Sequence, residues 1–216
     1  LSPALASGST VLRALPLFPS FTVYFPALAE KSIEIVGVFL LRAYLNGNDT
    51  HARQKMHVAS CLAGLAFNSA SLGLTHGMAH QLGAQFHIPH GRANAILMPH
   101  VIRYNAKDPA KHALFPKYEY FHAHEDYAEI ARFIGFKGNT TEELVESLVQ
   151  EINTLGTDIG IDMSLKNQGV TTETLYDTVD HLAELAFEDQ CTTANPKQPL
   201  ISELKQIIVD AFEEVK

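Results

Sequence analysis

Four histidines fall within fifteen consecutive residues of this 216-residue chain, at His76, His80, His87 and His90. Imidazole is the commonest side-chain metal ligand and the one side chain that titrates unperturbed near neutral pH. His76 and His80 are four residues apart, so on a helix they share one face. The helical HExxH pattern of metalloproteases is absent, because Gly77 stands where its glutamate would be.

His90 follows a proline in an Ile-Pro-His-Gly turn, where it would be a ligand from a second structural element. The alternative is a histidine that caps carbonyl groups at a helix end. His87 precedes that proline and is expected to face solvent. No ionisable cluster surrounds the remaining histidines. Six of them are interpreted as surface residues: His51, His57, His112, His122, His124 and His181. His100 is interpreted as an ordinary histidine of either the core or the surface.

Other catalytic chemistries lack their motifs, since the chain has no GxSxG elbow, no Walker A loop and no GxGxxG fingerprint. A hydrolytic metalloenzyme would need an acidic general base beside its ligands, and residues 73–91 contain no Asp or Glu. Cys61 and Cys191 have no CxxC partner. We therefore expect two free thiols in a reducing cytoplasm, with Cys191 partly exposed in a polar loop.

Composition and charge exclude several partners. The formal charge of −8 argues against a nucleic-acid-binding surface, which would be basic. Apolar residues make up 46% of the chain and charged residues 19%, as in ordinary globular proteins. No apolar run reaches the roughly 18 residues that a spanning helix needs, and the N-terminal segment lacks a signal-peptide pattern, so no membrane partner is expected.

Helical periodicity dominates the chain after residue 27 and predicts an all-α helical bundle. Helices are expected near residues 27–45, 51–86, 89–105, 124–134, 140–156, 172–187 and 200–214, with N-caps at Asp49 or Thr50, at Thr140, and at Thr171 or Thr172. The helix at 51–86 is apolar or small nearly all round, which suits the middle of a bundle. Residues 1–27 are rich in Pro and Phe and are expected to be irregular, with a short strand at 21–25.

The histidine region carries a longer pattern in three segments: AGLAFN at 63–68, GLTHGMAHQLG at 73–83 and IPHGRANAIL at 88–97. These segments resemble the metal-binding half of iron-containing (group III) alcohol dehydrogenases. Two later segments, YAEIA at 127–131 and AFEDQCTTANPKQPLISELKQ at 186–206, are similar to the alcohol dehydrogenase module of bifunctional aldehyde–alcohol dehydrogenases. The resemblance covers about residues 28–216.

The resemblance implies the all-α C-terminal lobe of the iron-dependent alcohol dehydrogenase and dehydroquinate synthase-like fold. In that family an α/β lobe binds the nicotinamide cofactor, and the all-α lobe holds one Fe²⁺, or sometimes Zn²⁺, through one Asp and three His. By position, His76 and His90 correspond to two metal ligands and His80 to a catalytic, proton-handling histidine near the nicotinamide. Phe67 corresponds to an aromatic residue that lines the substrate cleft.

Two features of the family have no counterpart here. No Asp precedes Asp49 and no His precedes His51, so the DxxxH segment that carries the other two ligands is absent. No cofactor-binding residue is found, so NAD is expected only where a nucleotide-binding lobe is supplied as a partner. We therefore divide the chain into an atypical segment, 1–27, and a metal-binding lobe, 28–216, and expect a truncated enzyme.

Two functions fit this pattern. The first is the C-terminal lobe of a metal- and NAD-dependent alcohol dehydrogenase, which interconverts a short primary alcohol and its aldehyde. The second is a non-catalytic helical module that keeps the fold and self-associates as a homo-oligomer but performs no hydride transfer. Whether the 216 residues are an enzyme on their own is left open by the sequence.

Overall fold

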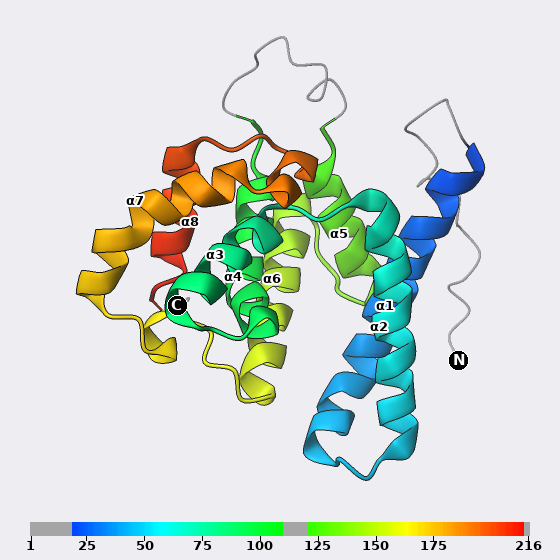
Figure 1. Cartoon of the computed structure of the whole chain (residues 1–216). Coiled ribbons are helices and arrows are strands. Elements are labelled where there is room, and N and C mark those ends of the chain that lie inside the picture. The colour runs from blue at the N-terminus through cyan, green and yellow to red at the C-terminus, as the bar shows by residue number, and fades with distance from the viewer. Residues whose placement is uncertain (1–18, 110–120, 214–216) are drawn as a thin grey trace.

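The computed structural model describes residues 19–109 and 121–213, and every regular element within them is helical. The α-helices are α1 (Pro19–Leu45), α2 (Thr50–Ala70), α3 (Leu74–Phe86), α4 (His90–Ala106), α5 (Ala123–Phe133), α6 (Thr141–Asp158), α7 (Thr172–Glu188) and α8 (Ile201–Asp210), with 3-10 turns η2 (Lys166–Gln168) and η3 (Gln190–Ala194). The prediction of an all-α bundle is confirmed (Figure 1).

Three helices begin at capping side chains that the sequence predicts. Asp49 accepts a hydrogen bond from the Ala52 N–H at 2.9 Å at the start of α2. Thr140 and Thr171 do the same for α6 and α7, each accepting at 3.2 Å from the N–H three residues later. Such caps satisfy donors that have no partner within the helix, which is why these boundaries follow from local sequence.

The strand expected at residues 21–25 is wrong, because this segment lies inside α1, which begins at Pro19. Within the described residues no strand is assigned, so an extended segment there would have no neighbour to accept its backbone hydrogen bonds. A helix satisfies them internally, even though Pro26 removes one donor. The remainder of the N-terminal prediction, residues 1–18, lies outside the described residues.

The helix expected at 51–86 is in fact two helices, α2 and α3. Ser71 adopts a left-handed φ of 63°, and its N–H donates to the Phe67 carbonyl oxygen at 2.8 Å, which closes α2. At the start of α3 the Leu74 N–H donates to Oδ1 of Asn195 at 3.3 Å. A residue far along the chain therefore helps to set this boundary, which the local run of small residues does not reveal.

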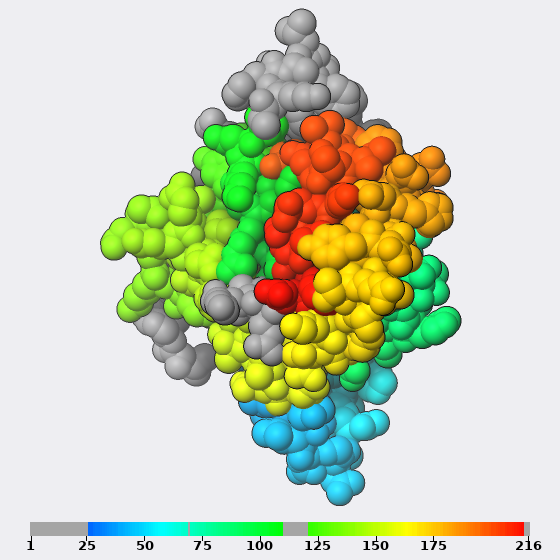
Figure 2. Space-filling view, turned by 90° about the vertical axis from the view of Figure 1, so that its left-hand side faces the viewer, coloured from blue at the N-terminus to red at the C-terminus, as the bar shows by residue number. Residues whose placement is uncertain are grey.

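Two apolar clusters hold the helices together. The larger cluster packs α3 and α4 against α7 and α8, and its completely buried large side chains are Leu74, Met78, Leu82, Ile96, Leu97, Leu165, Leu175, Val179, Leu204 and Ile208. The smaller cluster joins α4 to α5 and α6. Figure 2 shows α8 in red between α4 in green and α7 in yellow and orange. Because α4 contributes to both clusters, it is the central element of the fold.

Helices α1 and α2 pack against each other as a hairpin whose turn projects from the rest of the molecule (Figures 1 and 2). The Ser32 hydroxyl links them by donating to the Ala59 carbonyl oxygen at 2.8 Å. Several large apolar side chains of the hairpin are exposed: Val38, Tyr44, Leu45, Val58, Leu65 and Phe67. None of the helices in the described part of the chain combines the length and apolar character needed to cross a lipid bilayer.

Candidate metal and proton-transfer site

The three histidines singled out by the sequence meet at the junction of α3 and α4. His76 and His80 lie one turn apart on α3, and His90 is the first residue of α4. The ring centroids of His76 and His90 are 5.2 Å apart, those of His80 and His90 are 5.4 Å apart, and those of His76 and His80 are 6.2 Å apart. The two helices therefore bring all three imidazoles into one cluster.

The turn between α3 and α4 places His90 opposite α3. His87 ends α3 in a left-handed conformation with a φ of 56°, and Pro89 then precedes the first residue of α4. The Asn94 side-chain amide donates to the His90 carbonyl oxygen at 2.9 Å and lies 3.2 Å from Nε2 of the His90 ring. His87 is exposed, as the sequence predicts.

The spacing of His76 and His90 fits a shared divalent ion. An imidazole nitrogen lies roughly 2.0–2.1 Å from Zn²⁺, which puts two ring centroids about 5 Å apart when both rings bind one ion tetrahedrally. The observed 5.2 Å agrees with this value and is the shortest separation among the three histidines. The donor set also suits the chemistry, because imidazole nitrogen is a good ligand for Fe and Zn.

The environment of His76 favours its neutral form. Burial lowers the pKa of His76 below its ordinary value, the neighbouring His90 and His80 lower it further, and Asp189 opposes them. A neutral imidazole presents the lone pair that a metal requires, whereas a protonated one repels the ion.

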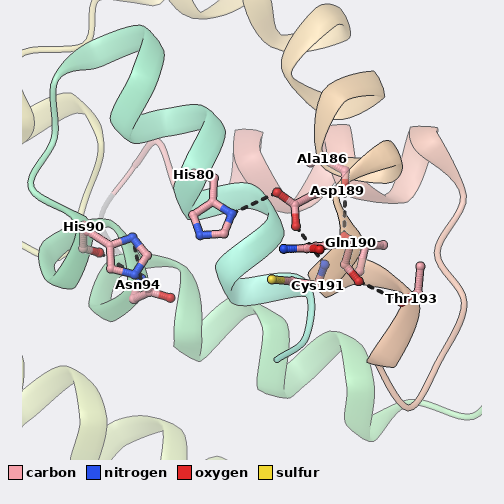
Figure 3. A network of polar contacts seen from close by, with 9 residues as sticks. His80, His90, Asn94, Ala186, Asp189, Gln190, Cys191 and Thr193 are labelled. Atoms are coloured by element: carbon pink, nitrogen blue, oxygen red, sulfur yellow. Dashed lines mark hydrogen bonds and ion pairs between the residues drawn. The ribbon is translucent and has the colours of Figure 1, made fainter. Parts of the chain in front are cut away.

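His80 has a carboxylate partner that the sequence analysis missed. Its Nδ1 lies 2.9 Å from Oδ2 of Asp189, and Figure 3 shows the His80 ring between His90 and Asp189. Burial acts to raise the pKa of Asp189, but hydrogen bonds from His80 and Cys191 outweigh it and hold that pKa below its ordinary value. An ionised Asp189 carboxylate can only accept, so Nδ1 of His80 donates to it, and in the neutral tautomer that this bond selects Nε2 is the acceptor.

Asp189 is 109 residues beyond His80, so no local spacing links the two. Asp189 and Cys191 both lie in the segment 186–206 that resembles the alcohol dehydrogenase module, but that resemblance assigned no role to Asp189. Cys191 is only 8% exposed, so the expectation of a partly exposed thiol is wrong. Both cysteines are free, as predicted.

Two buried asparagines fix the position of α3 beside α4. Oδ1 of Asn195 accepts from the Leu74 N–H at 3.3 Å and from Nδ2 of Asn105 at 3.2 Å. Nδ2 of Asn195 donates to Oδ1 of Asn105 at 2.8 Å and to the Lys197 carbonyl oxygen at 2.7 Å. The start of the helix that carries His76 is thus tied to the last turn of the helix that carries His90.

Phe67 stands on α2, a different helix from the two that carry the histidine cluster, and is 47% exposed. Its place in a substrate cleft therefore stays a prediction. Among the remaining histidines, His51, His57, His122 and His181 are exposed as expected, but His124 is half-buried. His112 lies outside the described residues.

A model of the Fe-containing alcohol dehydrogenase family, C-terminal, matches residues 20–212. The chain belongs to this family. An aldehyde-alcohol dehydrogenase of Streptococcus pneumoniae is 47% identical over 88% of this chain and 21% of its own length. An NADPH-dependent butanol dehydrogenase of Clostridium saccharobutylicum is 42% identical over 83% of this chain and 42% of its own length.

Solved structures agree with the family assignment. A 1,3-propanediol oxidoreductase shares 35% of its sequence with the chain and superposes with a TM-score of 0.75, over 87% of this chain and 45% of the other. The chain thus covers only part of each relative's length, from 21% of the aldehyde-alcohol dehydrogenase to 45% of the 1,3-propanediol oxidoreductase. The family match begins within α1, and the division of the chain at residue 27 stays a prediction.

Proposed function

We propose that this chain is the metal-binding lobe of an alcohol dehydrogenase that interconverts a short primary alcohol and its aldehyde. In this proposal a nicotinamide cofactor is held by a separate nucleotide-binding lobe. The family assignment supports the reaction class. The observation that carries the proposal is the 5.2 Å separation of the His76 and His90 rings, which suits two imidazoles on one ion.

The residues divide the work between metal binding and proton transfer. A bound Fe²⁺, or alternatively Zn²⁺, would supply Lewis-acid polarisation of the alcohol oxygen. His76 and His90 would hold that ion through their neutral nitrogens. His80 would receive the alcohol proton on Nε2, because Asp189 holds the Nδ1 proton in place. The His80 side chain is 40% exposed, so water can take the proton onward.

The proposal is tested with a chimera in which this chain replaces the matching segment of the Streptococcus pneumoniae relative. Purified chimera is given Fe²⁺, NADH and acetaldehyde, and loss of NADH absorbance is followed. We expect turnover that falls by about 100-fold or more in His76→Ala and in His90→Ala, because several kcal/mol of Lewis-acid stabilisation are lost and each 1.4 kcal/mol is tenfold.

His57→Ala is the matched control, because His57 is exposed on α2 and outside the histidine cluster, and it should keep full turnover. Full turnover with either His76→Ala or His90→Ala would show that the ligand assignment is wrong. The chimera and its His57→Ala variant could instead both bind Fe²⁺ normally and yet show no turnover. That result would favour a non-catalytic helical module.

A further inference from the structure

A second group of metal-ligating atoms lies beside the histidine cluster. Nitrogen of His80, a carboxylate oxygen of Asp189 and the Cys191 sulfur all lie within 4.8 Å of one another. Neither Asp189 nor Cys191 is among the ligands that the family pattern implies. The three side chains come from α3 and from the start of η3, so the fold, and no sequence motif, assembles them (Figure 3).

The segment that carries Asp189 and Cys191 is held rigidly. Oδ1 of Asp189 accepts from the Cys191 backbone N–H at 2.8 Å, which holds the Asp189 carboxylate against the Cys191 backbone. The Thr192 hydroxyl donates to the Ala186 carbonyl oxygen at 2.6 Å, and the Thr193 hydroxyl donates to the Gln190 carbonyl oxygen at 2.7 Å. The first bond ties η3 to the end of α7 and the second closes η3 itself, so the backbone that carries two of the three donor groups is positioned before any ligand arrives.

We propose that His80, Asp189 and Cys191 form a second divalent-metal site, selective for a thiophilic ion such as Zn²⁺ or Cd²⁺. One nitrogen, one oxygen and one sulfur donor, with water in the fourth position, make a tetrahedral set of the kind that Zn²⁺ accepts. The thiolate disfavours Mg²⁺ and Ca²⁺, which prefer oxygen ligands. The His76 and His90 pair contributes no ligand to this site.

Charge and protons balance in this site. On binding, the Cys191 sulfur forms a bond to the ion and its proton leaves to water, while the single proton of neutral His80 moves from Nδ1 to Nε2 by exchange with water and Nδ1 binds the ion. The Cys191 thiolate and the Asp189 carboxylate then neutralise the two positive charges. Metal–ligand bonds of roughly 2.0–2.3 Å bring tetrahedral ligand atoms to within about 3.3–3.8 Å of one another. The separation between any two of the donor atoms therefore needs to shrink by about 1.5 Å at most, from a starting value of no more than 4.8 Å.

An ion bound here would occupy Nδ1 of His80 and break its hydrogen bond to Asp189. If His80 transfers the alcohol proton, the second site is inhibitory. That consequence rests on the proposed function, whereas the site itself does not.

The test is a Cd²⁺ titration of the purified chain, followed by the near-ultraviolet charge-transfer band of a cadmium–thiolate bond. We expect the band to saturate at one equivalent and to resist an excess of Mg²⁺. Cys191→Ser should abolish the saturable band. Cys61→Ser, the matched thiol control on exposed α2 surface, should leave it unchanged.

Two further variants leave the Cys191 thiol in place, so the test does not depend on Cys191→Ser folding. Asp189→Asn and His80→Gln should each weaken Cd²⁺ binding by about tenfold or more, since even outer-shell partners of a metal are worth 10–100-fold. The double variant His76→Ala/His90→Ala should keep the band, which separates this proposal from the proposed function. Binding that survives Cys191→Ser, or that is unaffected by both Asp189→Asn and His80→Gln, overturns the proposal.

Discussion

His100 is the residue whose surroundings most clearly oppose its charged form. It lies half-buried on α4, and its Nε2 is among the buried side-chain atoms that have no hydrogen-bond partner. Burial lowers the pKa of His100 to about 4, with Arg103 lowering it further and Asp210 opposing the shift. An unfolded histidine binds a proton near pH 6.5. Between these two values the unfolded chain therefore binds more protons at this residue than the folded chain.

The free energy of unfolding should therefore fall as pH is lowered from 6.5 to about 4, because stability rises with pH where the unfolded state binds more protons. His100 should account for about 2–3 kcal/mol of that loss, at 1.36 kcal/mol for each unit of pKa difference. Urea unfolding of the wild type and of His100→Gln at two pH values, about 7 and about 4.5, measures it. The variant should lose less stability on acidification, and His57→Gln should behave as the wild type. An equal loss in all three proteins would contradict this assignment.

Residue types and spacing predicted part of the site. The four-residue interval between His76 and His80 predicted a shared helical face, and both rings do lie on α3 within one cluster. Asp189 could not be predicted in this way, because its partnership with His80 depends on how α7 and η3 pack against α3.

Helix α3 approaches η3 so closely that Gly77 has no room for a side chain. A Cβ on Gly77 would collide with Oγ1 of Thr192, and the hydrogen bond from that hydroxyl to Ala186 prevents its retreat. Gly77→Ala should therefore lower the free energy of unfolding by about 1–3 kcal/mol, the usual cost of overpacking. Thermal and urea unfolding measure the change.

Gly64 provides the matched helical control, because nothing lies within 4 Å of a Cβ placed there. Gly64→Ala should raise the free energy of unfolding by up to about 1 kcal/mol, since Ala is the better helix former. If Gly77→Ala and Gly64→Ala change the free energy of unfolding in the same direction and by the same amount, close contact between α3 and η3 at Gly77 is contradicted.

Helix boundaries were predictable where local side chains set them and not where distant contacts do. Thr140 and Thr171 cap α6 and α7 through neighbours three residues away, so the sequence locates both starts. The break between α2 and α3 depends partly on Asn195, which bonds the start of α3 from far along the chain. The pattern of small residues at 51–86 contains no information about that distant contact. The strand expected at 21–25 failed for a similar reason, because strand formation depends on a partner that the described chain does not offer.

At the scale of the whole molecule, α4 links the two apolar clusters and begins with His90. The three-histidine cluster therefore lies where α3 meets the helix that joins both apolar clusters, and α4 lies away from the projecting hairpin turn (Figure 1). The chain matches its relatives only in part, and the sequence shows no DxxxH segment before His51. We accordingly expect His76 and His90 to bind an ion more weakly in this chain than in the chimera.

The most direct test of the central claim is anomalous diffraction at the iron edge from crystals of the chain soaked anaerobically in Fe²⁺. We predict one peak roughly 2.0–2.2 Å from a ring nitrogen of His76 and from a ring nitrogen of His90, as for other metal–imidazole bonds. Crystals of His76→Ala should lose that peak. Two imidazoles directed into different spaces, with no ion between them at saturating iron, would contradict the account.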